Sequence, residues 1–274
     1  MKTKNKKNNL SLKATQLGNG KQGGSMGGSS SLIYGILPVV ELLKSERRKV
    51  EKILISENIR SDKIAEIIGA SKERGIRVEK ASRQVFERHL GEGVNHQGVI
   101  AFASAGSYYD SEKLFEEIVE KENSLCVVLD GIEDPRNFGA ILRSAEGAGV
   151  DGIFIPERRA VGLTETVAKS SAGATEYVKV AKVTNVNRLI DNLKARNVWV
   201  IGTSGEANMA YADWDWKHSS ALVLGSEGHG LHRLTAEKCD ALVKIPMNGR
   251  IESLNVSVAA GVILFEAVRQ RGKD

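Results

Sequence analysis

The pattern of hydrophobic and polar positions divides the chain into a polar beginning, a short mixed segment and a longer carboxyl-terminal part. Residues 1–31 contain almost no large apolar side chains and are rich in Lys, Asn, Gly and Ser. Such a composition buries too little apolar surface to offset the entropy lost on ordering. The pattern therefore predicts a disordered tail over residues 1–31.

Residues 32–105 alternate between helical and strand-like text, which predicts a small α/β domain. A helix is expected over residues 38–44, and a second helix follows an N-cap at Ser61, buries Ile64, Ile67 and Ile68, and ends at Gly75. Strands are expected over residues 52–56, from residue 76 to 78, and over residues 97–103. Residues 106–121 are polar and predict a linker.

The strands expected within residues 122–274 are almost continuous apolar runs. They read LCVVLD, GIFIP, VWVIGTS, ALVLGS and ALVKIP, and helical text separates them. Unbroken apolar strands are typical of a sheet covered on both faces, which indicates a mostly parallel sheet. A last helix over residues 254–271 is apolar nearly all round, so we expect it to be buried or to cover a subunit interface.

Charge adds little to this picture, although 39 basic residues against 34 acidic ones give a net charge of +5. Six lysines and no acidic residue fall within residues 1–31, which leaves the rest of the chain at −1. A basic tail attracts phosphates without sequence selection. Net charge alone therefore does not indicate a nucleic-acid-binding protein.

The cysteines and the hydropathy exclude several other classes. Cys126 and Cys239 are the two cysteines, and both lie far apart in apolar text, which predicts neither a disulfide framework nor a metal site. No apolar run approaches the roughly 18–20 residues that a membrane-spanning helix needs. We expect a cytoplasmic protein that binds no membrane and no metal.

The first of three loops with candidate chemistry reads DGIEDPRNFGAILR, from Asp130 to Arg143. A strand ends at Asp130, and a helix is expected to begin near Asn137, which can cap it. Loops at the carboxyl ends of strands are where open α/β sheets bind ligands. An ordinary helix cap beside a surface arginine is the alternative interpretation.

The second loop, LGSEGHGL, follows the apolar run ALVL and holds three glycines, which let the backbone approach a ligand closely. It does not match the dinucleotide fingerprint, and Glu227 would repel a pyrophosphate. A carboxylate in this place suits a cationic or hydroxyl-bearing ligand, although a plain tight turn remains possible.

The third loop, IPMNGRIESLNVSV, leads into the last helix through Ser253, Leu254, Asn255 and Ser257. These side chains offer more hydrogen-bonding groups than a helix cap requires, and free backbone amides at the helix start can hold a ligand. His229 and His232 are three residues apart, but no further ligand pattern completes a zinc site, so we interpret them as surface histidines.

Together the three loops resemble the motifs of the SpoU branch of the SPOUT RNA 2′-O-methyltransferases. The similar stretches are DPRNFGAILRSAEGAGVDGIFIP, LVLGSEGHGL and IPMNGRIESLNVSVAAGVILFEAVRQ, and the resemblance covers residues 125–271. Residues 32–105, with YGILPVVELLK and NHQGV, resemble the substrate-binding domain of the rRNA guanosine 2′-O-methyltransferase subgroup.

The resemblance implies a trefoil knot in the carboxyl-terminal part, a homodimer, and S-adenosylmethionine held by the backbone of the second and third loops. The residues implied to bind the cofactor are Gly225, Gly228, Ile245, Met247 and Leu254. The residues implied in catalysis and substrate binding are Asn137, Arg143, Glu227, Ser253 and Asn255.

The implied function is methylation of a ribose 2′-hydroxyl, on a guanosine in large-subunit ribosomal RNA. Because a sulfonium methyl group is already electrophilic, the protein has only to align the hydroxyl and remove its proton. A guanidinium keeps its proton and is a poor base, so Arg143 is expected to position the target phosphate and lower the pKa of the hydroxyl. The alternatives are a tRNA 2′-O-methyltransferase of the same branch and a non-catalytic RNA-binding module for ribosome assembly.

Overall fold

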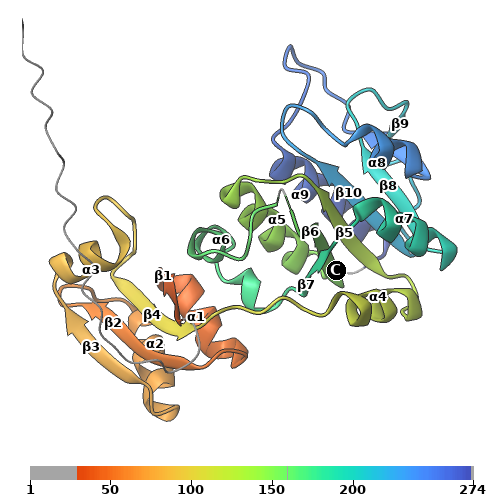
Figure 1. Cartoon of the computed structure of the whole chain (residues 1–274). Helices are drawn as coiled ribbons and strands as arrows, with labels where there is room; N and C mark the ends of the chain where they lie inside the picture. Colours follow the sequence, from red (N-terminus) through yellow and green to blue (C-terminus); the bar gives the residue numbers. More distant parts are fainter. Residues whose placement is uncertain (1–29, 159, 273–274) are drawn as a thin grey trace, which may run out of the picture.

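A computed structural model describes residues 30–158 and 160–272 of the chain (Figure 1). The predicted tail lies outside the described residues, except that Ser30 and Ser31 already belong to strand β1 (Ser30–Tyr34). This strand was not expected from the sequence. It pairs along its whole length with β4 (Val99–Ser104), and this pairing supplies the hydrogen bonds that its backbone N–H and C=O groups need.

The amino-terminal unit is a four-stranded sheet with the order β1-β4-β2-β3, in which only β2 and β3 run parallel. Helices α1 and α2 share one hydrophobic core with one face of this sheet, and Phe86 of α3 packs on the other face. The remaining elements are β2 (Val50–Ser56), β3 (Arg77–Ala81), β4 (Val99–Ser104), α1 (Ile36–Ser45), α2 (Asp62–Glu73) and α3 (Arg83–Leu90).

Most sequence predictions for this unit are confirmed. Ser61 caps α2 by accepting a hydrogen bond from the backbone N–H of Ile64, and Gly75 follows the helix with φ at +64°. Ile68 differs from the expected buried stripe, because its side chain is 46% exposed. Helix α3 was not predicted, because it carries few apolar residues and buries only Phe86.

The second unit is a seven-stranded sheet in the order β7-β6-β5-β10-β8-β11-β9, and every paired strand runs parallel to its neighbour. Central strands β5 and β10 are buried along their whole length, which confirms the predicted parallel sheet. The strands are β5 (Leu125–Asp130), β6 (Gly152–Pro156), β7 (Val180–Val183), β8 (Trp199–Thr203), β9 (Met209–Ala210), β10 (Ser220–Gly225) and β11 (Ala241–Lys244).

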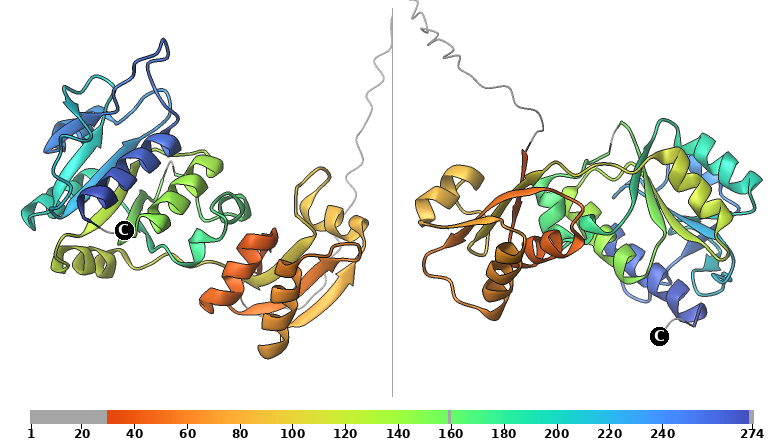
Figure 2. Two further views of the ribbon diagram at one scale, coloured as in Figure 1. Left: turned by 180° about the vertical axis from the view of Figure 1, so that it is seen from behind. Right: turned by 90° about the horizontal axis from the view of Figure 1, so that it is seen from below.

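Helices cover both faces of this sheet (Figure 2). Helices α4 (Ser111–Glu120) and α7 (Val186–Ala195) pack on one face, with α8 (Arg233–Lys238) beside α7. Helices α5 (Pro135–Gly147) and α9 (Val256–Gln270) pack on the other face, with α6 (Glu165–Ser170) and the 3₁₀ turn η1 (Ala174–Glu176) at its edge. No helix in the described ranges is long and apolar enough to cross a bilayer.

Two predictions for the second unit need correction. The expected linker contains α4, because Leu114 and Ile118 bury themselves under the sheet while the acidic residues between them face solvent. The last helix begins at Val256 rather than at residue 254, and one of its sides is buried, while a subunit interface on the other side stays a prediction. Val258 and Phe265, on its other side, are 50% and 51% exposed.

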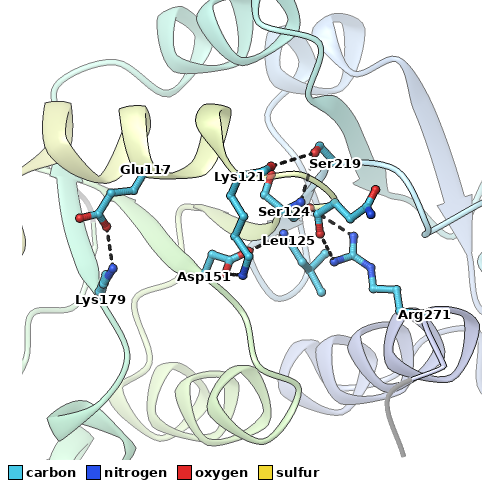
Figure 3. Close-up of polar contacts among 9 residues, drawn as sticks. Glu117, Lys121, Ser124, Leu125, Asp151, Lys179, Ser219 and Arg271 are labelled. Atoms are coloured by element: carbon cyan, nitrogen blue, oxygen red, sulfur yellow. Dashed lines mark hydrogen bonds and ion pairs between the residues drawn. The ribbon is translucent and has the colours of Figure 1, made fainter.

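Arg271 fastens the carboxyl end of α9 to the amino-terminal end of β5 (Figure 3). Its guanidinium donates to the carbonyl oxygens of Trp216, Asn123, Ser124 and His218 at 2.7, 2.6, 3.2 and 3.0 Å. Burial lowers the pKa of this side chain from its ordinary value. Four carbonyl partners therefore replace the water that the charge loses.

We predict that Arg271→Met lowers the free energy of unfolding by about 2–4 kcal/mol, because it removes the four hydrogen bonds by which a half-buried guanidinium ties α9 to the segments before β5 and β10. Urea unfolding of the full chain measures this change. Arg233→Met, on α8, removes only an exposed ion pair with Glu237 and should leave the unfolding midpoint unchanged. Equal effects of the two substitutions would contradict the anchoring role of Arg271.

Candidate functional site

The three candidate loops meet at the carboxyl ends of β5, β10 and β11, as the parallel sheet requires. The loops after β10 and β11 line one cavity of about 1000 Å³. All five residues expected to bind a cofactor line it, and so do three of the five expected to act on substrate. The eight are Gly225, Gly228, Ile245, Met247, Leu254, Glu227, Ser253 and Asn255.

The backbone around Gly225 is too crowded for any side chain. A Cβ atom at this position would lie 2.1 Å from the carbonyl carbon of Gly230 and 2.3 Å from the backbone nitrogen of Leu231. The loop from Gly225 to Leu231 forms a closed turn, because Ser226 and Gly230 exchange backbone hydrogen bonds of 2.9 and 3.0 Å. Gly228 and Gly230 adopt φ values of +84° and +66°, which favour glycine. This tight turn forms one wall of the cavity.

Asn255 joins the three loops through its side-chain amide. The Oδ1 atom caps α9 by accepting from the backbone N–H groups of Ser257 at 2.9 Å and Val258 at 3.4 Å. The Nδ2 group donates to Oδ1 of Asn137 at 3.0 Å and to Oε1 of Glu227. Three of the predicted site residues thus form one hydrogen-bonded cluster, which we call the Asn255 cluster (Asn137, Glu227 and Asn255).

The position of Asn137 corrects a sequence prediction. Asp134, not Asn137, caps α5, and Pro135 occupies the first helical position. The Oδ1 atom of Asp134 accepts from the backbone N–H groups of Arg136 at 2.6 Å and Asn137 at 3.0 Å. Because another residue caps the helix, the side chain of Asn137 is free to accept from Asn255.

Arg143 lies apart from the cavity. It is exposed on α5, it does not line the cavity, and its guanidinium has no hydrogen-bond or ion-pair partner within residues 30–158 and 160–272. The next residue, Ser144, faces α9, since a Cβ atom at Gly261 would lie 3.4 Å from its hydroxyl oxygen. The structure therefore places Arg143 on the exposed surface of α5, outside the cavity.

Sequence reasoning missed the pairing of Asp130 with His232. The largely buried carboxylate of Asp130 lies 2.9 Å from Nδ1 of His232 and accepts from the backbone N–H of the same residue at 3.0 Å. This contact ties the end of β5 to the loop after β10. An aspartate directly after five apolar residues was the available signal, because a carboxylate in that position needs a partner.

The cavity wall is more acidic than the sequence motifs suggested. Glu206 and Glu252 line it together with Glu227, whereas Lys244 is the lysine among its described lining residues. Glu206 comes from the loop after β8, which carried no motif. An acidic wall favours a ligand with positive charge over a phosphate group.

Two family comparisons cover nearly all of the described chain. Residues 124–265 match the SpoU rRNA Methylase family, and residues 32–109 match the RNA 2′-O ribose methyltransferase substrate-binding family. The chain belongs to the SpoU methylase family. Both parts of the resemblance proposed from the sequence are therefore confirmed.

Named relatives of this family match over almost their full length. The 23S rRNA (guanosine-2′-O-)-methyltransferase RlmB of Escherichia coli (strain K12) is 39% identical over 242 residues, which are 88% of this chain and 99% of that protein. RlmB of Pectobacterium atrosepticum is 41% identical over 243 residues, with shares of 89% and 99%.

Solved structures of the SpoU family have the same fold. An AdoMet-bound rRNA methyltransferase from Sinorhizobium meliloti superposes with a TM-score of 0.70 at 26% identity, and the match covers 88% of this chain and 87% of that one. The TrmH/SpoU tRNA-modifying enzyme of A. aeolicus has a TM-score of 0.50 at 31% identity and covers 58% of this chain and 81% of its own.

We predict that Gly225→Ala lowers the free energy of unfolding by about 1–3 kcal/mol, because the new methyl group would overlap backbone atoms. Thermal unfolding with a calibrated baseline measures the change. Gly205→Ala is the matched control, since Gly205 also lines the cavity but faces open space. Its stability should stay within about 0.5 kcal/mol of the original chain; a comparable loss there would refute the steric account.

Proposed function

We propose that this chain transfers a methyl group from S-adenosylmethionine to the 2′-hydroxyl of a guanosine ribose in large-subunit ribosomal RNA. The Asn255 cluster carries the proposal, because it holds three separate loops together at the edge of a ligand-sized cavity. The relatives described above bear the names of 23S rRNA guanosine methyltransferases and are matched over almost their full length.

The size and the lining residues of the cavity fit S-adenosylmethionine. The cavity volume of about 1000 Å³ accommodates a nucleoside joined to an amino acid, and the backbone at Gly228, which faces open space, allows a ligand to approach closely. Carboxylates in its wall complement a positively charged sulfonium group. When bound, S-adenosylmethionine supplies a methyl group on an electrophilic sulfur. Gly225, Gly228, Ile245, Met247 and Leu254 would hold it.

The remaining site residues orient the acceptor ribose. Asn137 and Glu227 are fixed by Asn255, so their remaining polar atoms are pre-oriented towards a ligand at the cavity edge. Ser253 adds a hydroxyl in the same loop. Arg143 binds the phosphate next to the target ribose and lowers the pKa of its 2′-hydroxyl. The proton passes to that phosphate as the carbon–oxygen bond forms and the carbon–sulfur bond breaks.

The same proposal includes a trefoil knot and a homodimer. The knot is proposed because residues 124–265 match the SpoU family, whose resemblance implied it. Pairing of two copies would bury the exposed side chains of Val258 and Phe265. Arg143 does not line the cavity of its own chain. It therefore contacts RNA that extends from the cavity to α5, or it contacts RNA bound at the cavity of the other copy in the homodimer.

The amino-terminal unit favours ribosomal RNA over tRNA as the substrate. Residues 32–109 match a substrate-binding family, whereas the tRNA-modifying enzyme named above matches little more than half of this chain. We divide the chain into a tail (1–31), a substrate-binding domain (32–105), a connection (106–121) and a methyltransferase domain (122–274), with two adjustments. Ser30 and Ser31 join the substrate-binding domain through β1, and α4 of the connection packs on the methyltransferase domain.

Labelled methyl transfer tests the proposal directly. The purified chain, S-adenosylmethionine and unmodified 23S ribosomal RNA should yield one methylated ribose, and tRNA should yield none. Mapping by primer extension at low nucleotide concentration identifies the position. Transfer to tRNA alone would favour the tRNA enzyme, and cofactor binding without transfer to any RNA would favour a non-catalytic module.

We predict that Arg143→Ala reduces kcat by about 100-fold or more while cofactor affinity stays within about twofold, because Arg143 contacts only the RNA. Arg143→Lys should recover part of the activity, since lysine keeps the charge but loses the two-pronged donor geometry. Arg188→Ala removes an exposed arginine on α7 and serves as the control. An Arg143→Ala enzyme as active as this control would rule out the assigned role.

We predict that Asn255→Ser preserves α9 but reduces methyl transfer by about 100-fold, because serine can cap the helix but cannot bridge Asn137 and Glu227. Unfolding stability should change by less than about 1 kcal/mol. Asn185→Ser makes the same change at the N-cap of α7, away from the cavity, and should keep full activity. If both variants turn over equally fast, the Asn255 cluster has no part in the reaction.

A further inference from the structure

Helix α6 is shared between the two units of the molecule. The side chain of Val167 belongs to the core beneath the seven-stranded sheet, whereas its neighbour Ala168, only 4% exposed, belongs to the core of the amino-terminal sheet. Both views in Figure 2 place α1 beside the segment that carries α6 and η1. We call residues 164–178 the docking segment.

Polar contacts surround this apolar contact on several sides. The most buried is the ion pair between Arg48 and Glu176, at 3.1 Å, whose side chains are 10% and 3% exposed. Four further links join the amino-terminal unit to the docking segment. They are Lys169 Nζ to Gln97 Oε1 at 2.5 Å, Tyr177 Oη to Glu41 Oε2 at 2.7 Å, Leu32 N to Glu165 Oε1 at 3.3 Å, and Arg47 Nη1 to the carbonyl oxygen of Tyr177 at 3.1 Å.

A glycine on each side allows the two units to approach closely. A Cβ atom at Gly35 would lie 2.3 Å from Nζ of Lys169, and one at Gly173 would lie 2.6 Å from Cβ of Glu41. Both glycines have positive φ values, +100° and +94°. On both contacting surfaces, a glycine with positive φ leaves room for a side chain of the other unit. The two surfaces therefore fit together in the observed relative position of the two units.

The docking segment also rests on the helix that carries Asn137 and Arg143. Ser170 donates a hydrogen bond to the carbonyl oxygen of Pro135 at 3.1 Å, and a Cβ atom at Gly139 would lie 1.9 Å from its hydroxyl oxygen. Helices α5 and α6 therefore pack with almost no space between them. The amino-terminal unit is attached to the element that presents the candidate site.

We propose that the docking segment positions the amino-terminal unit at a fixed place relative to the cavity, and that this placement selects the nucleotide to be methylated. The inference rests on the proposed function. RNA held by a freely tethered unit could present several neighbouring riboses in turn, with an effective concentration set only by the tether. RNA held by a docked unit presents one ribose at one distance, which raises both the rate and the selectivity.

Ala168→Glu is the sharpest test, because a carboxylate cannot remain unpaired in the core of the amino-terminal unit. Once the units separate, the new side chain is solvated on the surface of α6, and neither core loses an atom. Thr166→Glu is the matched control, since it adds the same charge to an exposed position on the same helix. Small-angle X-ray scattering of the full chain should give a larger radius of gyration for Ala168→Glu only.

Methylation of unmodified 23S ribosomal RNA provides the functional readout. In Ala168→Glu, kcat/KM should fall by about tenfold or more, and methyl groups should spread to additional riboses, while cofactor affinity stays within about twofold. A variant that remains compact would show that the docking segment does not hold the units together. A separated variant that still modifies one ribose at the original rate would overturn the selection role.

An exchange of partners gives an independent check. Lys169→Glu should weaken docking, because it places a carboxylate against Oε1 of Gln97. Adding Gln97→Lys places a positive charge opposite the new carboxylate at position 169. The double variant should therefore recover both compactness and single-site methylation, whereas a loss of stability in α6 would not be repaired by a change at position 97. Failure of this rescue would count against the inference. An original chain that binds cofactor but methylates no RNA would instead contradict the proposed function, and scattering would still report the docking.

Discussion

The parallel alignment of the central strands is the constraint on which the candidate site depends. All paired strands of the larger sheet run in one direction, so the loops after β5, β8, β10 and β11 emerge at one edge. The opposite edge has a different task. There Arg271 joins the end of α9 to the start of β5 and leaves the carboxyl-terminal edge free for ligands.

Asn255 couples the folding of the last helix to the assembly of the site. Its Oδ1 atom satisfies two N–H groups of α9, a contribution of about 1 kcal/mol that many residues could make. Its Nδ2 group reaches Asn137 and Glu227, which a shorter side chain could not do. The site is therefore complete only when α9 has formed, because Asn255 joins Asn137, which lies 118 residues earlier in the chain, to Glu227, which lies 28 residues earlier.

The elements predicted most accurately from the sequence are the strands whose residues are all buried. Strands β5 and β10 are buried at every position, so their apolar runs are unambiguous. Helix α4 was missed because its segment is polar as a whole, although Leu114, Phe115, Ile118 and Val119 mark the side that packs on the sheet. The helix start at Asp134 was missed although Asp-Pro is a strong N-terminal signal. Contacts such as Asp130 with His232 join residues far apart in the chain, so the local pattern shows that Asp130 needs a partner but does not identify His232 as that partner.

The contacts of the docking segment define a geometry more than they add stability. Ala168 buries one methyl group, and a buried ion pair such as Arg48 with Glu176 gains in attraction about what it loses in hydration. The covalent connection supplies the local concentration that makes such a weak interface sufficient. If the two units shifted relative to each other, the charged pair would lose its contact and other backbone would have to fit where the two positive-φ glycines now lie, so shifted positions are strongly disfavoured. Weak attraction with strict complementarity is what a positioning device requires, because RNA must enter and leave while the distance to the cavity stays constant.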